Sequence, residues 1–381
     1  MNAVIDDDAF APHIAQVSVA KRYVYLDNGA VAPICDPAAE GLRRYAEEAN
    51  LHGEIKEPTW SMRVDETRTL AARLLHCTPE EIAFAKNTSE GIAFVANGLA
   101  FEPGDNVVTT NVEFPANYYP WENLKHKGVE LRLANEQRDG RIPPESVEAL
   151  VDERTRVIAL SSVEFSSGFR HDLERIGALC RKRGIFFFVD GIQSVGVLDD
   201  DLKALGVHAL AADGHKWLLA PEGIAIFYLD EAKLDEVAVI EKGWTNVVNA
   251  SAYLDYDPTL RADARRFECG SPNNAGLHAL HGSLKMLLDI GVPLIEARAL
   301  ALSDYLCEGL ESKGYTIFSS RRPREKSPIV SFYKQGLDLR PIQIELRKQQ
   351  IVVAYRDGRL RASPHFYNTR ANLDRLLDAL P

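Results

Sequence analysis

The chain lacks the short motifs that mark several large enzyme classes. It contains no GxGxxG, GxxxxGK[ST], HExxH or GxSxG pattern, so dinucleotide-binding, P-loop, zinc-protease and serine-hydrolase functions have no motif here. Cysteine is scarce as well, with five among 381 residues and neither a CxxC pair nor a metal-finger spacing. This pattern favours reduced thiols in a cytoplasmic compartment over a disulfide framework.

Long apolar runs and clustered positive charge are also missing. No stretch approaches the roughly 18 uninterrupted apolar residues of a membrane span. The acidic N-terminus, Met1 to Asp8, carries no basic-then-apolar signal. The formal net charge of −11 argues against a nucleic-acid surface, because phosphate binding needs clustered Lys and Arg. We therefore expect a cytoplasmic protein without membrane or nucleic-acid partners.

Short apolar runs alternate with longer amphipathic stretches between about residues 60 and 255. The runs that predict strands are Ile82–Ala85, Asn106–Thr110, Val129–Leu133, Val157–Ser161, Ile185–Asp190, His208–Ala212 and Gly223–Tyr228. Helical patterns between them include Arg63–Leu75, Leu173–Arg183 and Asp201–Leu205. The alternation predicts an α/β fold with a mostly parallel sheet and helices on both faces. Ligands of such sheets bind beyond the carboxyl ends of the strands.

The pattern changes after about residue 260. Two helical stretches, four short strands and a last helix follow, namely Leu277–Ile290, Leu294–Ser312, Thr316–Phe318, Ile329–Tyr333, Ile351–Tyr355, Leu360–Ser363 and Arg370–Leu380. This order indicates a smaller α+β domain. We predict a large domain over residues 21–260 and a small domain built from residues 1–20 and 261–381.

Lys216 is the most informative single residue. It lies between His215 and Trp217, directly after an apolar run and before Gly223, in a segment that reads as partly sheltered. Buried lysines are rare and lower their pKa readily. A partly neutral amine can form a Schiff base with an aldehyde. Taken alone, this lysine is better explained as an ordinary surface charge.

Four further features fall at strand ends or helix starts. Asp190 ends a very apolar strand and could pair with a cationic ring nitrogen, although an Asx turn or helix cap is the commoner role. Thr88 and Ser89 open a helix, where they could hold a phosphate or serve only as a cap. Phe114 could stack on a flat ring or be plain core. Arg361 could hold a carboxylate or lie on the surface.

Together these features outweigh their separate explanations. An amine, an acid, a phosphate cradle, an aromatic ring and a guanidinium are the groups needed to bind pyridoxal 5′-phosphate and an amino acid. A metal is not expected, because His278 and His281 lie three residues apart on a predicted helix without a nearby third ligand.

The sequence resembles the class V aminotransferase family, which includes cysteine desulfurases, selenocysteine lyases and isopenicillin N epimerases. The resemblance runs from Tyr25-Leu26-Asp27-Asn28-Gly29-Ala30 to Tyr367-Asn368-Thr369, and its strongest motifs are Val189-Asp190-Gly191-Ile192-Gln193-Ser194 and Asp213-Gly214-His215-Lys216-Trp217. It implies the aspartate aminotransferase-like fold of pyridoxal-phosphate-dependent transferases.

The resemblance also implies a role for each matching residue. Lys216 would be the Schiff-base lysine and Asp190 the partner of the pyridine nitrogen, while Gln193 would hydrogen-bond the phenolic oxygen. The remaining assignments are Thr88, Ser89 and His215 to the phosphate, Phe114 to the ring face, Arg361 to the substrate carboxylate, and Asn28 and Gly29 to the substrate side. Ser271 matches a residue that completes the phosphate site of the neighbouring subunit, which implies a homodimer with sites at its interface.

Three departures from the family pattern bear on function. Desulfurases carry a nucleophilic cysteine shortly before the arginine that Arg361 matches, whereas Ile351–Leu360 forms a tight hairpin pattern without cysteine. Phe165 stands in place of an asparagine that contacts the cofactor. Asp213 stands where desulfurases have a phosphate-binding serine, which is unfavourable unless the acid turns outward or hydrogen-bonds to His215.

These observations predict an enzyme that acts at the α-carbon of a small amino-acid substrate. We expect a desulfurase-like C–S lyase that eliminates the β-substituent without a persulfide cysteine. Transamination and epimerisation share the first steps and stay open as alternatives. A pyridoxal-phosphate-binding protein without turnover is the remote alternative, disfavoured because Lys216, Asp190 and Arg361 are all present.

Overall fold

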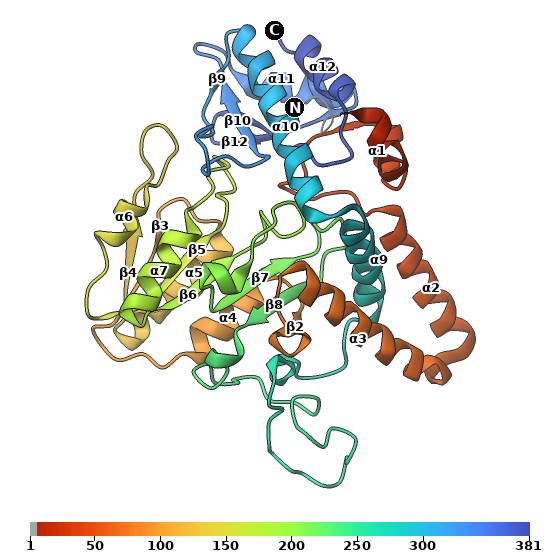
Figure 1. Ribbon diagram of the computed structural model, residues 1–381, viewed down its shortest axis with the longest axis vertical. Helices are drawn as coiled ribbons and strands as arrows, with labels where there is room; N and C mark the ends of the chain where they lie inside the picture. Colours follow the sequence, from red (N-terminus) through yellow and green to blue (C-terminus); the bar gives the residue numbers. More distant parts are fainter. Residues whose placement is uncertain (1–5) are drawn as a thin grey trace.

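A seven-stranded sheet forms the centre of the larger part of the molecule (Figure 1). The computed structural model describes residues 6–381. Along the sheet the strand order is β2-β8-β7-β6-β5-β3-β4. The strands span Ile82–Ala85 (β2), Asn106–Thr110 (β3), Glu130–Ala134 (β4), Thr155–Ser161 (β5), Phe186–Asp190 (β6), Ala209–Asp213 (β7) and Ala225–Leu229 (β8). Only β8 pairs antiparallel with its neighbours, which confirms the predicted mostly parallel sheet.

Both faces of this sheet are covered, as predicted. In β5, Ile158 and Leu160 belong to one core cluster, while Val157 and Ala159 belong to another on the opposite face. Side chains of a strand alternate between the two faces, so a strand buried on both reads as a continuous apolar run. The helices on the first face are α3 (Glu57–Leu74), α7 (Leu173–Arg183) and α9 (Asn274–Ile290), and those on the second are α4 (Thr88–Gly98) and α5 (Tyr119–Glu122).

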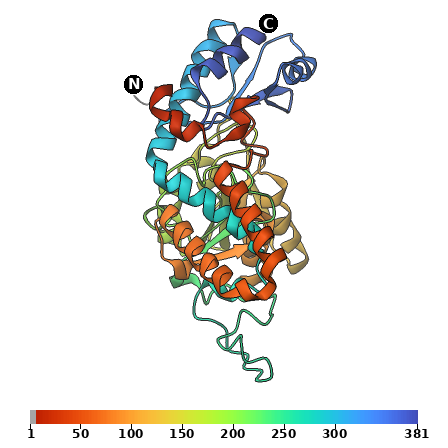
Figure 2. The ribbon, with the colours of Figure 1, turned by 90° about the vertical axis from the view of Figure 1, so that its right-hand side faces the viewer.

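A smaller layer packs above the large sheet in Figures 1 and 2. It holds a four-stranded antiparallel sheet of order β12-β13-β10-β9 and a parallel pair of β1 with β11. Its strands are β1 (Val24–Tyr25), β9 (Thr316–Ile317), β10 (Val330–Tyr333), β11 (Ile351–Val352), β12 (Ala354–Arg356) and β13 (Arg359–Ala362). Its helices are α1 (Asp7–Ile14), α10 (Val292–Ser312), α11 (Leu339–Lys348) and α12 (Arg370–Ala379).

The strand predicted over Ile351–Tyr355 is wrong as a single element. β11 pairs with β1, whereas β12 pairs with β13, so the chain changes sheet at Val353. The other predicted strands are found with ends shifted by no more than two residues, for example β5 and β8. Shared periodicity cannot show that a run of apolar residues serves two sheets.

The predicted division at residues 20 and 260 stays a prediction, and its first five residues lie outside the described range. Packing gives the positions of the cores instead. Leu277 and Leu284 of α9 join the core of the large sheet, while Val24 and Leu26 join that of the small layer. Within residues 6–381, no helix combines the length and the apolar character that crossing a membrane requires.

Polar contacts fix the small layer against the loop that follows β5. The hydroxyl of Ser319 donates to the backbone oxygen of Ser167 at 2.5 Å, and Ser327 donates to that of Gly168 at 2.7 Å. Arg141 holds Glu325 through Nε at 2.7 Å and through a second nitrogen at 2.5 Å. Bidentate pairs of this kind add geometric specificity. The small layer therefore presents its strands to the carboxyl end of the large sheet in a fixed position.

Candidate active site

A cavity of about 300 Å³ lies at the carboxyl ends of the large-sheet strands. Ten of the twelve predicted site residues line it, namely Gly29, Thr88, Ser89, Phe114, Asp190, Gln193, Asp213, His215, Lys216 and Arg361. They come from segments more than 300 residues apart in the sequence, from Gly29 to Arg361. The structure thus brings the separate features of the sequence into one place.

Lys216 and Asp190 follow neighbouring parallel strands. Lys216 lies in the turn after β7 and is 6% exposed, while Asp190 ends β6 and is 1% exposed. Burial lowers the pKa of the Lys216 amine to about 8, with Asp190 opposing the shift. Burial raises the pKa of Asp190 to about 6, and the backbone N–H of Ile192 opposes this by donating to Oδ1 at 3.0 Å. Near neutral pH, Asp190 is therefore mostly ionised, and a fraction of the Lys216 amine is neutral.

Two further buried carboxyls lie near Asp190 and were not predicted. Burial raises the pKa of Glu164 to about 8, and it raises the pKa of Glu113 well above its ordinary value. Ser161 donates to Glu113 from its backbone N–H at 2.7 Å, and its hydroxyl lies 2.6 Å from the same carboxyl. Asp190 is consequently the carboxyl of this group that stays ionised at neutral pH. No motif in the sequence marks the two glutamates, which follow β3 and β5.

The start of α4 and the turn after β7 form a polar cradle. Asn87 caps the helix by accepting from the backbone N–H of Glu90 at 2.9 Å. The Thr88 hydroxyl accepts from the backbone N–H of Asp213 at 3.0 Å, which ties the helix start to β7. Free N–H groups at a helix start favour an anion such as phosphate. Thr88, Ser89 and His215 therefore lie where the resemblance expects them.

Asp213 faces His215 across a short gap. Oδ1 of Asp213 lies 3.0 Å from Nδ1 of His215, yet the pair lacks hydrogen-bond geometry. Neither atom has a hydrogen-bond partner within residues 6–381. Two buried polar atoms without partners indicate that a small rotation, or a bound polar group, completes this part of the cradle.

The aromatic wall consists of Phe114 and Phe165. Their rings meet edge to face, with centroids 5.3 Å apart and an interplanar angle of 81°. Nζ of Lys216 lies 5.4 Å from the centroid of Phe114. Phe165, which stands in place of the family asparagine, supplies an apolar surface where the family has an amide. The structure accordingly pairs an aromatic ring with the reactive amine.

Gly29 and Gln193 shape the opposite wall. The Gln193 amide donates to the backbone oxygen of Gly29 at 2.9 Å and accepts from the indole of Trp217 at 3.0 Å. A Cβ at Gly29 would lie 3.3 Å from Oε1 of Gln193 and 3.4 Å from the guanidinium carbon of Arg361. The position therefore leaves little room for a side chain between these two groups.

Arg361 reaches the cavity from β13 of the small layer and is 1% exposed. One terminal nitrogen donates to the backbone oxygen of Phe165 at 2.5 Å, and the other pairs with Oδ1 of Asp27 at 3.1 Å. Its Nε has no partner within residues 6–381. Such a buried guanidinium keeps donor capacity for a carboxylate.

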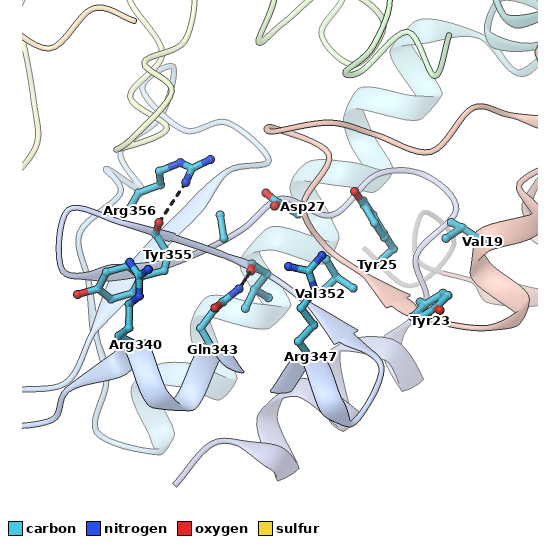
Figure 3. A pocket seen from close by; sticks show the side chains of 12 residues that line it. Val19, Tyr23, Tyr25, Asp27, Arg340, Gln343, Arg347, Val352, Tyr355 and Arg356 are labelled. Atoms are coloured by element: carbon cyan, nitrogen blue, oxygen red, sulfur yellow. Dashed lines mark hydrogen bonds between the residues drawn. The ribbon is translucent and has the colours of Figure 1, made fainter. Parts of the chain in front are cut away.

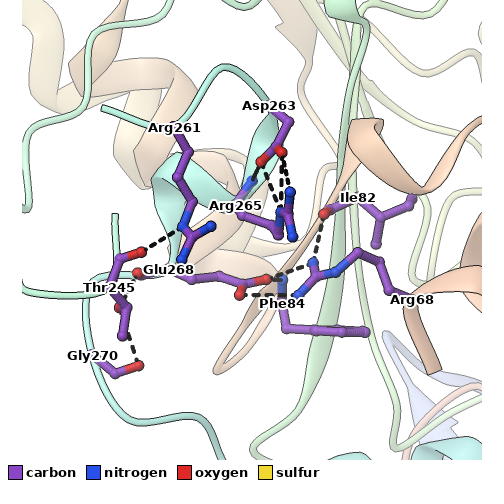
Figure 4. A network of polar contacts seen from close by, with 9 residues as sticks. All are labelled: Arg68, Ile82, Phe84, Thr245, Arg261, Asp263, Arg265, Glu268 and Gly270. Atoms are coloured by element: carbon purple, nitrogen blue, oxygen red, sulfur yellow. Dashed lines mark hydrogen bonds and ion pairs between the residues drawn. The ribbon is translucent and has the colours of Figure 1, made fainter. Parts of the chain in front are cut away.

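Asn28 and Ser271 do not line this cavity. Asn28 is fully buried behind Gly29, where it donates to the backbone oxygen of Ser363 at 2.8 Å. Ser271 is exposed and lines a separate cavity of about 220 Å³. Figure 4 shows how Glu268 anchors the preceding segment, accepting from Arg68 at 2.7 and 3.1 Å and from the backbone N–H of Phe84 at 2.8 Å. Both positions keep their predicted roles as predictions.

Sequence reasoning missed Asp27 and Arg356. Asp27 holds Arg361 in place, and Arg356 lines the cavity from β12. Asp27 lies within a motif that the resemblance rests on, which was the available indication. Nothing local distinguishes Arg356 from its neighbour Arg359, because only the fold shows which side chain faces the cavity.

The expected hairpin without cysteine is present. β12 and β13 pair antiparallel around Asp357 and Gly358, which adopt φ of 46° and 76°. None of the five cysteines lines the cavity, and the exposed one, Cys269, lines the separate cavity beside Ser271. No thiol therefore lies where it could accept sulfur directly from this site.

The residues present fit pyridoxal 5′-phosphate on structural grounds. A buried amine with a lowered pKa, an ionised acid on the neighbouring strand and a helix-start cradle line one cavity. The unpartnered atoms of Asp213, His215 and Arg361 border the same space. This is the set of groups that the cofactor and an amino acid would engage.

Comparison with known proteins agrees with this interpretation. The family model described as Aminotransferase class-V matches residues 24–376. A probable cysteine desulfurase of Methanothermobacter thermautotrophicus is 27% identical over 391 aligned residues, covering 96% of this chain and 95% of that protein. The apo structure of a cysteine desulfurase from Thermococcus onnurineus NA1 superimposes with a TM-score of 0.86 at 25% identity, covering 98% and 96% of the two chains.

A second solved structure shares the fold. The cystine C–S lyase C-DES, in complex with its product cysteine persulfide, superimposes with a TM-score of 0.87 at 21% identity over 95% of this chain and 98% of its own. With most of the chain matched by one family model, and with a site that fits the cofactor, this protein belongs to the class V aminotransferase family of enzymes that depend on pyridoxal 5′-phosphate.

Proposed function

We propose that this enzyme is a C–S lyase that eliminates the sulfur substituent of a cysteine-type amino acid and does not pass that sulfur to a thiol of its own. The observation that carries the proposal is the Lys216 cavity, which no cysteine lines and which the β12–β13 hairpin borders without supplying one. A structural relative of the same fold is a cystine C–S lyase. The net reaction yields a thiol or hydrosulfide, pyruvate and ammonium, with one water consumed.

The substrate would be oriented from the small layer. Arg361 is buried and fixed by Asp27 and the Phe165 backbone, and its unpartnered Nε leaves a donor for the α-carboxylate. A preorganised guanidinium loses little entropy on binding. The α-carbon would thereby be presented to the Lys216 amine.

Lys216 is suited to move a proton at the α-carbon. Its amine has a pKa of about 8 because it is buried, so it is poised near physiological pH. When bound, the cofactor supplies the electron sink that makes the α-proton acidic. Asp190 stays ionised next to it and would keep the ring nitrogen protonated. The protonated lysine can then donate to the departing sulfur.

We further propose that the enzyme is a homodimer with sites at its interface. Ser271 has no role at the cavity of its own chain and is exposed, as expected of a residue that serves a neighbour. The nearby segment that projects at the bottom of Figures 1 and 2 exposes large apolar side chains, with Leu254 at 90% and Tyr256 at 86%. Exposed apolar clusters of this kind indicate a protein interface.

A product analysis tests the reaction. L-cysteine, L-cystine and S-alkylcysteines should give pyruvate and a thiol in equal amounts, while the L-enantiomer remaining is not racemised. Accumulation of pyridoxamine phosphate without pyruvate would indicate an aminotransferase, and D-amino acid would indicate an epimerase. Trapping a persulfide on Cys269 or any other cysteine would contradict the proposal and restore a desulfurase.

Arg361→Gln serves as the matched variant. It should raise KM for these substrates by roughly 10- to 100-fold, because a charge-assisted hydrogen bond contributes about 1.5–3 kcal/mol. The exposed Arg43→Gln on α2 (Asp36–His52) should leave KM unchanged.

A further inference from the structure

A second and larger cavity lies in the small layer, directly behind the Arg361–Asp27 pair. It measures about 540 Å³ and is bounded by β1, the chain from β11 to β12, and α11. Figure 3 shows Arg340, Gln343 and Arg347 rising into it from α11, with Arg356 on the far side and Asp27 between Arg356 and Tyr25. None of the reaction steps above uses this space.

The cavity carries positive charge that the chain itself does not neutralise. Arg340, Arg347 and Arg356 line it, and none of the three forms an ion pair with any acid in the described part of the chain. The one acid in the lining is Asp27, whose carboxylate binds Arg361 at 3.1 Å. A chain of net charge −11 offers many acids, so three arginines left together without one point to an anion from outside.

Two of these arginines are held in place while their donors stay free. The guanidinium of Arg340 stacks 5.3 Å from the centroid of the Tyr355 ring. Arg356 donates from one nitrogen to the backbone oxygen of Tyr355 at 3.2 Å, visible as a dashed line in Figure 3. Each still has several N–H donors in the fork arrangement that binds carboxylates.

Arg356 connects this cavity to the active site. It lines both the 540 Å³ cavity and the 300 Å³ cavity that holds Lys216 and Arg361. The Asp27 carboxylate borders the former while holding Arg361, which lines the latter. A substrate whose α-carboxylate binds Arg361 therefore has an electropositive space within reach of its far end.

We propose that this cavity is a subsite for a second, distal carboxylate of the amino-acid substrate, recognised by Arg356 and Arg347 with Arg340 behind them. The proposal rests on the C–S lyase function proposed above and names its substrate class, namely cysteine thioethers or disulfides whose sulfur substituent ends in a carboxylate. Arg361 takes the α-carboxylate, and the arginine cavity takes the group that leaves with sulfur.

Matched ligands test the subsite by binding to the holoenzyme. S-carboxymethyl- and S-(2-carboxyethyl)-L-cysteine are compared with their neutral carbamoyl counterparts by calorimetry. The carboxylate form should bind about tenfold more tightly, since tenfold corresponds to about 1.4 kcal/mol. This ratio should fall toward one in Arg347→Gln and in Arg356→Gln, while Arg43→Gln, a surface substitution on α2, should keep it.

Product formation separates the two proposals. If the carboxylate preference in binding holds but no pyruvate forms, the subsite stands and the lyase proposal fails. If pyruvate forms equally well from both members of a pair and the affinity ratio is one, the lyase stands and the subsite is refuted. Inorganic phosphate binding at the three arginines with an affinity ratio of one would assign the cavity to a free anion, which also overturns the substrate proposal.

Discussion

At the scale of single residues, the Lys216 amine is the group whose state decides whether cofactor attaches. The neutral amine is the form that condenses with an aldehyde. Burial brings the pKa of Lys216 to about 8, whereas an exposed lysine titrates near 10.4. The rate of pyridoxal-phosphate incorporation into apoenzyme should therefore rise with pH and level off above about pH 8. Stopped-flow absorbance between pH 6.5 and 10.5 measures this, and a rate still rising at pH 10 would contradict it.

Two variants attribute that profile to its source. Lys216→Ala should bind the cofactor without a covalent link, so borohydride treatment followed by mass spectrometry finds none attached. Asp190→Asn removes the charge that opposes the shift, so the midpoint of the profile should move to lower pH. The matched surface variant is Lys285→Ala on α9, which should change neither result.

At the scale of elements, the close approach of α4 to β7 sets the position of the phosphate cradle. Gly91 permits this approach, because a Cβ there would lie 2.7 Å from Cβ of Ala211 and 3.3 Å from the Phe227 ring. Gly91→Ala should push the helix start outward and weaken the hydrogen bond from the Asp213 backbone to Thr88. We expect a destabilisation of about 1–3 kcal/mol from overpacking.

Gly91→Ala should also weaken cofactor affinity by several-fold, because Thr88 and Ser89 move with the helix start. Thermal unfolding and equilibrium dialysis of the cofactor measure the two effects. Asn97→Ala, at an exposed position of the same helix, is the control and should be neutral or slightly stabilising. A Gly91→Ala protein with unchanged melting temperature would show that α4 is free to shift.

The elements also show which parts of the fold were readable from sequence. Strands such as β5 and β6 are buried on both faces and announce themselves as apolar runs. The periodicity gave no comparable indication of α2, which buries fully only Ala38, or of α11, which buries only Leu339 and Leu346. Amphipathic patterns predict a helix in proportion to the face it buries.

The site divides in the same way. Residues next to strand ends or helix starts, such as Asp190 and Thr88, could be named because topology fixes where those points meet. Arg356, Glu113 and Glu164 could not, because their importance depends on which neighbour they face across the two layers. The arginine cavity is likewise a product of the fold, since α11 and β12 are brought against β1 only by the small layer.

At the scale of the whole molecule, the location of Ser271 requires a second subunit if it contributes to catalysis. It lines a cavity separate from that of Lys216, in a segment anchored by the Arg68–Glu268 pair. Ser271→Asp would place a negative charge against the phosphate of the neighbouring site. The homodimeric variant should bind cofactor roughly tenfold more weakly or worse, measured by dialysis. Ser312→Asp, at the exposed end of α10, is the control.

Mixed dimers decide which subunit the serine serves. Inactive Lys216→Ala chains are refolded or co-expressed with Ser271→Asp chains, so that each heterodimer contains one site with an intact lysine facing an intact Ser271 from the other chain. If Ser271 acts across the interface, activity at limiting cofactor should reappear on mixing, reaching at most half that of wild-type dimers for a pure heterodimer. If it acts within its own chain, every site carries one defect and mixing restores nothing. A protein that remains monomeric at micromolar concentration would refute the interface assignment outright, since the complementing serine would have no neighbouring site to reach.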